Sequence, residues 1–253
     1  MKLFFRKSGQ GQPLIILHGL FGSSDNWFTL SKQFAKDYTV YVVDQRNHGQ
    51  SPHSEVMNYG ALAEDLQLFV KENAISDPDI IGHSMGGKAA MNFAVKYPDM
   101  LRKLVVVDIV PKSYPVHHDA ILEGLHNIPL ATLKNRSKAD TLLSKFVPEP
   151  AVRQFLLKNL SRDADGRFEW KLNLSAIDQN IEAMGSGMIF SGKHDGPALF
   201  IRGEKSNYYE PGDEDRIKVI FPNAEFVTLN TGHWVQAEDP EGFARAVINF
   251  LAR

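Results

Sequence analysis

The sequence predicts an α/β domain in which a mostly parallel central sheet is flanked by helices and a helical segment is inserted between two core strands. Short apolar runs alternate with helix-like segments from residue 13 to about residue 110. The alternation stops between residues 111 and 196 and resumes at residue 197. We therefore expect a core made of residues 1–110 and 197–253, with residues 111–196 forming a helical lid or cap.

The composition fits one globular domain without a polyanionic partner. The chain has 253 residues, 43% of them hydrophobic, and its 28 basic and 30 acidic side chains give a formal net charge of −2. This balance argues against nucleic acid or an anionic membrane as a partner. The absence of cysteine excludes disulfides, thiolate metal sites and a thiol nucleophile. Because residues 1–11 lack a seven-residue apolar core and no run reaches 18 apolar residues, we expect a soluble, cytoplasmic protein.

The first elements follow in order from their apolar patterns. Residues 2–7 predict a short strand, and residues 13–17 predict a buried strand that ends in the glycine-rich loop His18-Gly19-Leu20-Phe21-Gly22. Asp25 is expected to cap a helix that extends to about Lys36. A β-branched strand at residues 39–43 ends in a polar loop.

In that loop, residues 44–52, the residues Asn47-His48-Gly49 favour a turn. Arg46 is expected to anchor the loop by hydrogen bonds. Residues 57–73 then have the periodicity of an amphipathic helix.

The most informative motif is Gly82-His83-Ser84-Met85-Gly86, which follows a short apolar run and precedes alanines at helical spacing. A serine at such a strand-to-helix corner is a nucleophile elbow, and flanking glycines remove the side chains that would block so sharp a turn. The amide of Met85 is expected to stabilise an oxyanion formed near the Ser84 hydroxyl. The second donor is expected to be the amide of Leu20, with that of Phe21 as the alternative, in the earlier glycine-rich loop.

Two further strand ends supply partners for Ser84. The strand at residues 101–107, which is apolar from Leu104 to Val107, ends at Asp108, one helix and one parallel strand after Ser84, so both residues should lie at the same edge of the sheet. After residue 197, a strand at 198–201, a helix at 214–220 and a strand at 225–229 lead to the loop Gly232-His233-Trp234. This position suits His233 as a general base. A final helix begins at Asp239-Pro240.

The inserted region contains helix-like segments near residues 116–126, 131–146 and 150–160, and a polar turn at residues 163–166. It is expected to contribute to an apolar-lined pocket. Its histidines are not accompanied by clustered carboxylates, so no metal site is predicted. These histidines are His117, His118, His126 and His194.

With these motifs in place, the whole chain resembles the α/β-hydrolase fold family, least closely in the inserted region. Its histidine and glycine motifs are similar to those of the YbfF-like group of bacterial acyl esterases and their eukaryotic abhydrolase relatives. These motifs are His18 to Gly22, Arg46 to Gly49, Gly82 to Lys88, and Gly232 to Trp234.

The catalytic acid is where this chain departs from many family members. They carry it in a Gly-x-x-Asp turn after the strand at residues 198–201, where this chain has Gly203-Glu204-Lys205-Ser206. In the YbfF-like group the acid maps onto Asp108. We favour Asp108 on topology, and Glu204 and Asp213 are the alternatives.

The resemblance implies a serine hydrolase of short to medium acyl esters, with acyl-CoA thioesters as further substrates. Ser84 would be the nucleophile, His233 the general base and Asp108 the acid, while Phe21 and Trp234 would bind a small-molecule substrate. No cofactor and no metal is implied. A haloperoxidase-like or C–C bond hydrolase would use the same triad, and a ligand-binding module would retain the fold without catalysis. A dehalogenase would need a carboxylate in place of Ser84.

Overall fold

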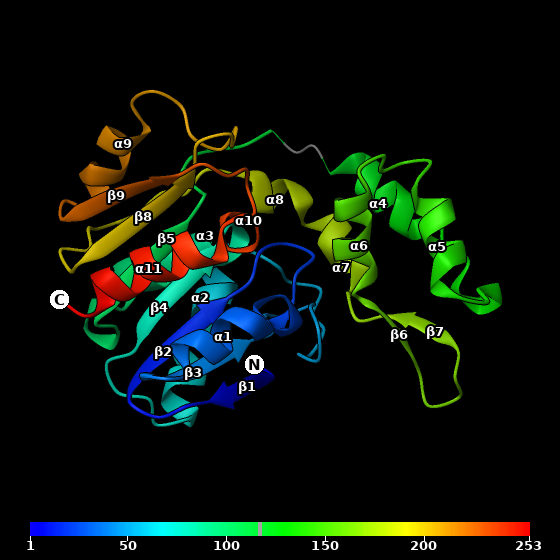
Figure 1. Ribbon diagram of the computed structural model, residues 1–253, viewed down its shortest axis with the longest axis horizontal. Coiled ribbons are helices and arrows are strands. Elements are labelled where there is room, and N and C mark those ends of the chain that lie inside the picture. Colours follow the sequence, from blue (N-terminus) through cyan, green and yellow to red (C-terminus); the bar gives the residue numbers. More distant parts are fainter. Residues whose placement is uncertain (116–117) are drawn as a thin grey trace.

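The centre of the protein is a twisted, mostly parallel sheet with helices on both faces (Figure 1). The computed structural model describes residues 1–115 and 118–253, and within them this sheet has seven strands in the order β1-β3-β2-β4-β5-β8-β9. The strands are β1 (Phe5–Ser8), β2 (Gln12–Leu17), β3 (Tyr38–Val43), β4 (Asp79–His83), β5 (Lys103–Val107), β8 (Ala198–Gly203) and β9 (Ala224–Leu229). Only the pairing of β1 with β3 is antiparallel among these neighbours. The predicted fold class is confirmed.

Side chains alternate between two apolar cores, one on each face of the sheet. On β2, Leu14 and Ile16 point to the face covered by α1 (Phe28–Phe34) and α11 (Pro240–Leu251). Ile15 and Leu17 point to the opposite face, which α2 (Tyr59–Glu72) and α3 (Met85–Lys96) cover. Because both faces are buried, the central strands are apolar without interruption, as parallel strands usually are.

Short helical elements complete the core. The helices are α9 (Asp213–Ile220) and α10 (Val235–Glu238), and 3₁₀ turns lie at Ser24–Trp27 and Pro98–Met100. The helix expected from Asp25 is therefore split, and Asp25 is not its cap. Asp25 instead pairs with Arg6 at 2.7 Å, while the Asn26 side chain accepts the Ser23 N–H at 2.7 Å.

The inserted segment, residues 111–196, lies between β5 and β8 and forms a layer at one end of the sheet (Figure 1). Its elements are α4 (Asp119–His126), a 3₁₀ turn (Leu130–Thr132), α5 (Arg136–Leu143), α6 (Pro150–Leu157), the antiparallel hairpin β6 (Leu160–Arg162) and β7 (Phe168–Trp170), α7 (Leu174–Gln179) and α8 (Ile181–Gly185). The first two residues of the helix predicted at 116–126 lie outside the described residues.

The predicted helix at 131–146 is shorter in the structure because Asn135 caps it, accepting the Lys138 N–H at 2.9 Å. The helix predicted at 150–160 also ends early, since its last predicted residue begins β6. The predicted turn at 163–166 is the tip of a hairpin that was not predicted.

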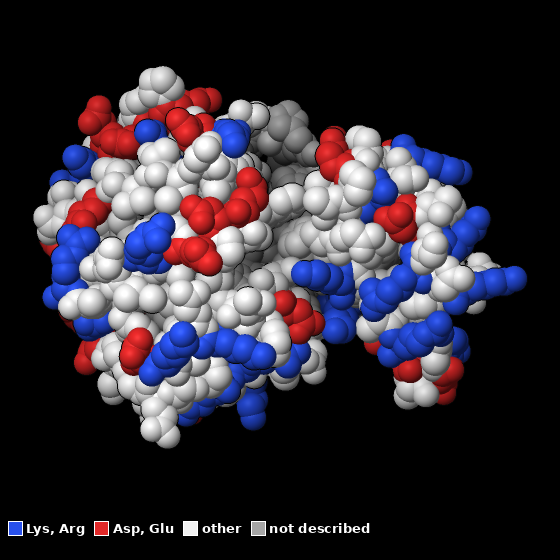
Figure 2. Space-filling view, in the orientation of Figure 1, with Lys and Arg blue, Asp and Glu red and all other residues white. Residues whose placement is uncertain are grey.

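The inserted segment is tied to the core by hydrogen bonds that cross the boundary between them. The pairs are Tyr59 Oη to Met184 O (2.8 Å), Lys88 Nζ to Ser186 O (2.7 Å), Asn159 Nδ2 to Phe21 O (2.7 Å) and Asn173 N to Asn47 O (3.0 Å). Figure 2 shows the surface hollowed along this boundary, with largely uncharged walls. Among the described residues, no helix has the length and apolar character needed to span a membrane.

Candidate active site

Ser84 lies at a strained corner between β4 and α3. Its backbone has φ 52° and ψ −116°, in a region that residues with a side chain rarely adopt. The flanking glycines allow the chain to turn so sharply. A Cβ on Gly82 would lie 2.3 Å from the Gly86 carbonyl oxygen, and one on Gly86 would lie 2.6 Å from the His18 carbonyl oxygen. The corner has the geometry predicted for a nucleophile elbow.

Asp108 follows β5, is fully buried and accepts hydrogen bonds on both carboxylate oxygens. Oδ1 accepts the Gly203 N–H at 2.9 Å. Oδ2 accepts the Ser206 hydroxyl and is 2.7 Å from His233 Nδ1. Because a carboxylate accepts the Nδ1 proton, the His233 lone pair is on Nε2, the nitrogen available to take a proton from a hydroxyl.

In the described part of the chain, neither alternative acid is hydrogen-bonded to His233. Glu204 has an exposed side chain. Asp213 is buried but forms ion pairs with Lys112 at 2.7 Å and Arg216 at 3.3 Å. Ser206, in the position where many relatives have the acid, donates to Asp108 instead. Among the three candidates, Asp108 is therefore the carboxylate hydrogen-bonded to His233.

A hydrogen bond to His48 occupies one of the two amides of the glycine-rich loop that were considered as oxyanion donors. It is fully buried, its Nδ1 lies 2.8 Å from the Arg46 carbonyl, and its Nε2 accepts the Phe21 N–H at 3.2 Å. Within the part of the chain that the structure describes, the Leu20 N–H has no hydrogen-bond partner. Of the two amides considered from the sequence, that of Leu20 is thus the one free to meet an oxyanion. Arg46 anchors its loop as expected, through an ion pair with Asp65 at 2.6 Å.

Two further buried histidines brace the same loops. His18 Nδ1 lies 2.8 Å from the Gly19 carbonyl, and its Nε2 accepts the Gln45 N–H at 3.0 Å. His83 Nε2 lies 2.9 Å from the carbonyl of His233. Burial lowers the pKa of His18 to about 4 and the pKa of His48 and His83 to about 3. All three imidazoles are therefore neutral near pH 7 and act as fixed donor–acceptor bridges.

From the lowered pKa of these three histidines, we expect acid to destabilise the fold. Their pKa is lower in the folded chain than the unfolded value of 6.5, so below pH 6.5 the unfolded chain binds more protons and stability falls as the pH decreases. As the pH falls below 6.5, each of these histidines lowers the free energy of unfolding by up to about 1.4 kcal/mol per pH unit, until the pH reaches its folded pKa. Urea unfolding at pH 7, 6 and 5 measures this slope.

The test variant is His48→Gln, because glutamine can still accept the Phe21 N–H. The matched control is His53→Gln, because His53 is exposed. The first should reduce the slope by about 1.4 kcal/mol per pH unit and the second should leave it unchanged. Equal stability of the parent chain at pH 5 and pH 7 would contradict the assignment.

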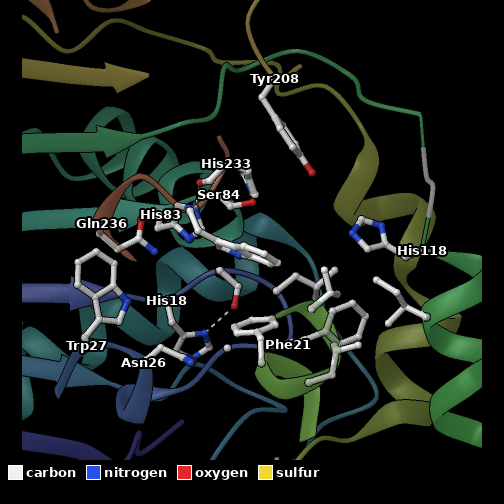
Figure 3. Close-up of a pocket in the computed structure, with 18 residues that line it drawn as sticks. His18, Phe21, Asn26, Trp27, His83, Ser84, His118, Tyr208, His233 and Gln236 are labelled. Atoms are coloured by element: carbon white, nitrogen blue, oxygen red, sulfur yellow. Dashed lines mark hydrogen bonds between the residues drawn. The ribbon is translucent and has the colours of Figure 1, made fainter. Parts of the chain in front are cut away.

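Two cavities meet at Ser84. The larger, about 110 Å³, is lined by Phe21, Trp27, Phe155, His233, Trp234 and Gln236 among others. The smaller, about 60 Å³, is lined by residues including Tyr59, Met85, Lys88, Ile109, Tyr114, Ile181 and Met184. Both are lined by Leu20, Ser84, His118 and Tyr208. Figure 3 shows His233 beside Ser84, with Phe21 and Trp27 on the wall of the larger cavity. The predicted pocket residues Phe21 and Trp234 both line that cavity.

Tyr208 was not singled out from the sequence. Its ring stacks on the His233 imidazole with centroids 4.0 Å apart and an interplanar angle of 15°. Its backbone N–H contacts Ser206 Oγ at 3.2 Å. Tyr208 therefore limits rotation of the imidazole. The sequence places it in a loop after β8, but no local pattern indicates a ring above His233.

The three histidines of the inserted segment that the structure describes have different surroundings. His118 lines both cavities, His126 pairs with Asp178 at 3.2 Å, and His194 is buried beside Phe221. His117 lies outside the described residues. In the described ranges, the structure has no group of three or more His, Asp or Glu side chains arranged to hold a metal ion.

In sequence and fold, the chain is similar to known hydrolases. The family model of the alpha/beta hydrolase fold matches residues 12–135. The sn-1-specific diacylglycerol lipase ABHD11 of Mus musculus is 38% identical over 248 aligned positions, in an alignment that covers 94% of this chain and 80% of that protein. The esterase YbfF of Escherichia coli is 38% identical over 259 aligned positions, in an alignment that covers 99% of each chain. A solved structure of a marine microorganism esterase has a TM-score of 0.96 and 43% identity, and covers 98% of this chain and 99% of that one.

Proposed function

Because this chain belongs to the α/β-hydrolase fold family, we propose that it is a serine hydrolase that cleaves carboxylic esters through an acyl-enzyme at Ser84. The observation that carries the proposal is the convergence of Ser84 and His233 on one cavity, with His233 hydrogen-bonded to the buried Asp108. The relatives named as esterases and lipases support the same reaction class.

The reaction begins when Nε2 of His233 takes the proton of Ser84 as its Oγ attacks the ester carbonyl. The carbonyl oxygen becomes an oxyanion, which the amides of Leu20 and Met85 stabilise; each such donor is worth about 3 kcal/mol of barrier. Collapse of the intermediate breaks the bond to the leaving group, which receives the proton from His233. Water, activated by the same imidazole, then attacks the acyl-enzyme and releases the acid.

The two cavities bind different parts of the substrate. His233 protonates the leaving group, so the leaving group must lie beside it. Of the two cavities, the described lining of the larger includes His233 and Trp234, whereas that of the smaller includes neither. The alcohol or thiol part therefore occupies the larger cavity, and the acyl group occupies the smaller one. This division supports short to medium acyl groups on either an oxygen ester or a CoA thioester.

The small volume of the acyl cavity predicts a chain-length limit. Along a p-nitrophenyl ester series from acetate to laurate, kcat/KM should be highest near butanoate and fall by about tenfold or more at laurate. Forcing extra methylenes into a filled site costs about 1–3 kcal/mol, which corresponds to that loss. A kcat/KM that increases up to laurate would contradict the assignment of the acyl group to the smaller cavity.

Fluorophosphonate labelling followed by peptide mass analysis tests the proposed function itself. The expected result is hydrolysis of p-nitrophenyl butanoate and of butanoyl-CoA, with one label on the peptide that contains Ser84. A folded protein that hydrolyses neither compound and takes up no label would instead indicate a ligand-binding module.

A further inference from the structure

Lys88 is a buried cation in the wall of the acyl cavity. It lies on α3 one turn after Ser84, and its backbone N–H donates to the Ser84 carbonyl at 3.0 Å. Only 1% of the residue is exposed, and it lines the smaller cavity together with Ser84 and Met85. Its charge is not required by the proposed hydrolytic steps.

The ammonium group has more hydrogen-bonding capacity than its protein partners use. Nζ donates to the Ser186 carbonyl at 2.7 Å, and an ammonium has three N–H donors. It also lies 5.3 Å from the ring centre of Tyr59 and 5.0 Å from that of Tyr114. These aromatic faces attract a cation but carry no net charge to neutralise it.

The hydroxyls of these tyrosines are already engaged. Tyr59 Oη donates to the Met184 carbonyl at 2.8 Å, and Tyr114 Oη donates to the Tyr208 carbonyl at 2.9 Å. Among the described residues, none of the ion pairs with a carboxylate includes Lys88. The cavity thus presents an uncompensated positive charge with unused donors.

The charge persists at neutral pH although its surroundings disfavour it. Burial lowers the pKa of Lys88 to about 8, so most molecules carry the ammonium form at pH 7. An unpaired buried charge is costly, and a methionine would fill the same space without that cost. An anionic group entering the cavity would gain a strong, charge-assisted hydrogen bond, because the other walls include Ile109, Ile181 and Met184.

We propose that Lys88 binds a carboxylate at the far end of a short acyl group, so that half-esters of dicarboxylic acids are preferred substrates. This inference rests on the proposed esterase function and on the assignment of the acyl group to the smaller cavity. Ser84 and Lys88 are four residues apart and line the same small cavity, so we expect the carboxylate and the reacting carbonyl to be separated by a short spacer of about two or three methylenes. Succinyl and glutaryl half-esters have these lengths.

The test compares each half-ester with a neutral compound of the same shape. Monoethyl succinate is matched by ethyl 4-methylpentanoate and monoethyl glutarate by ethyl 5-methylhexanoate, since an isopropyl group replaces the carboxylate in each. The measured quantity is the ratio of kcat/KM for the half-ester to that for its neutral match, at pH 7. We expect a ratio of at least tenfold for the parent protein, with the difference mainly in KM.

Lys88→Met should lower this ratio at least thirtyfold, because it removes the charge and keeps an unbranched side chain. Lys96→Met is the matched control: it makes the same chemical change at an exposed residue of α3, which pairs with Glu64 and lines neither cavity, so the ratio should remain as in the parent. The proposal is overturned if the parent shows no preference, or if Lys88→Met slows both members of each pair equally. Lys88 would then serve only as a hydrogen-bond donor to the Ser186 carbonyl.

Failure of the esterase function would be recognised separately. In that case neither half-esters nor neutral esters would be hydrolysed and Ser84 would take up no fluorophosphonate. Hydrolysis of the neutral esters without a carboxylate preference overturns the Lys88 proposal alone.

Discussion

Substituting Ser84 with alanine is expected to lower kcat for p-nitrophenyl butanoate by about 10⁴-fold or more. The substitution removes the nucleophile, so only the oxyanion donors and substrate binding remain to accelerate attack by water. The measurement is single-substrate kinetics on purified parent and variant proteins, with p-nitrophenol release as the signal. Labelling by fluorophosphonate should be lost in the same variant.

The fold should survive this change. Alanine adopts the same positive φ with the same strain, and the glycines at positions 82 and 86 leave the turn sterically free. The melting temperature of Ser84→Ala is therefore expected to match that of the parent within about 2 °C. A folded variant that retains a tenth of the parent activity would show that another group is the nucleophile.

Asp108→Asn is expected to lower kcat by about 10³–10⁴-fold. An amide has one oxygen, whereas Asp108 accepts from Gly203 on Oδ1 and from His233 and Ser206 on Oδ2. If the new NH₂ group faces His233, it donates to Nδ1 and the imidazole proton moves to Nε2. His233 could then no longer accept the proton of Ser84.

The backbone at this position makes asparagine a fair substitute, because Asp108 has φ 49° and asparagine tolerates that conformation well. Glu204→Gln is the matched control, since it makes the same chemical change in an exposed residue of the neighbouring loop. Its kcat should stay within about twofold of the parent, because surface substitutions usually have small effects. Loss of activity in Glu204→Gln with an active Asp108→Asn would transfer the acid role to Glu204.

The central strands of the sheet could be predicted from the sequence because they are apolar runs separated by amphipathic helices. β5 is buried along its whole length, and its pattern is clear without any tertiary information. The hairpin β6–β7 could not be predicted in the same way. Each of its strands has three residues, and only one of each three is buried, so no period of two is visible. The helices α7 and α8, with six and five residues, are similarly short.

The convergence of Ser84, Asp108 and His233 could be predicted because parallel strands end at one edge of a sheet. Their catalytic roles stay predictions for the experiments above. The choice between the amides of Leu20 and Phe21 was not accessible from the sequence, because it depends on His48 from another loop. The environment of Lys88 was equally inaccessible, since its partners Tyr59, Tyr114 and Ser186 come from distant parts of the chain.

The hydrogen bond from Asn159 to the Phe21 carbonyl joins the inserted segment directly to the loop that presents the Leu20 amide. A substrate that fills the cavities also presses on residues beside Asn159, such as Phe155 and Leu156. Poorly fitting substrates should therefore be discriminated by slow turnover rather than by weak affinity, because a loop displaced by a fraction of an ångström still admits them but no longer supports their oxyanion. Discrimination against bulky substrates would then appear in kcat, whereas the preference for a carboxylate appears in KM, and a different inserted segment would alter the first without any change in the residues that perform the chemistry.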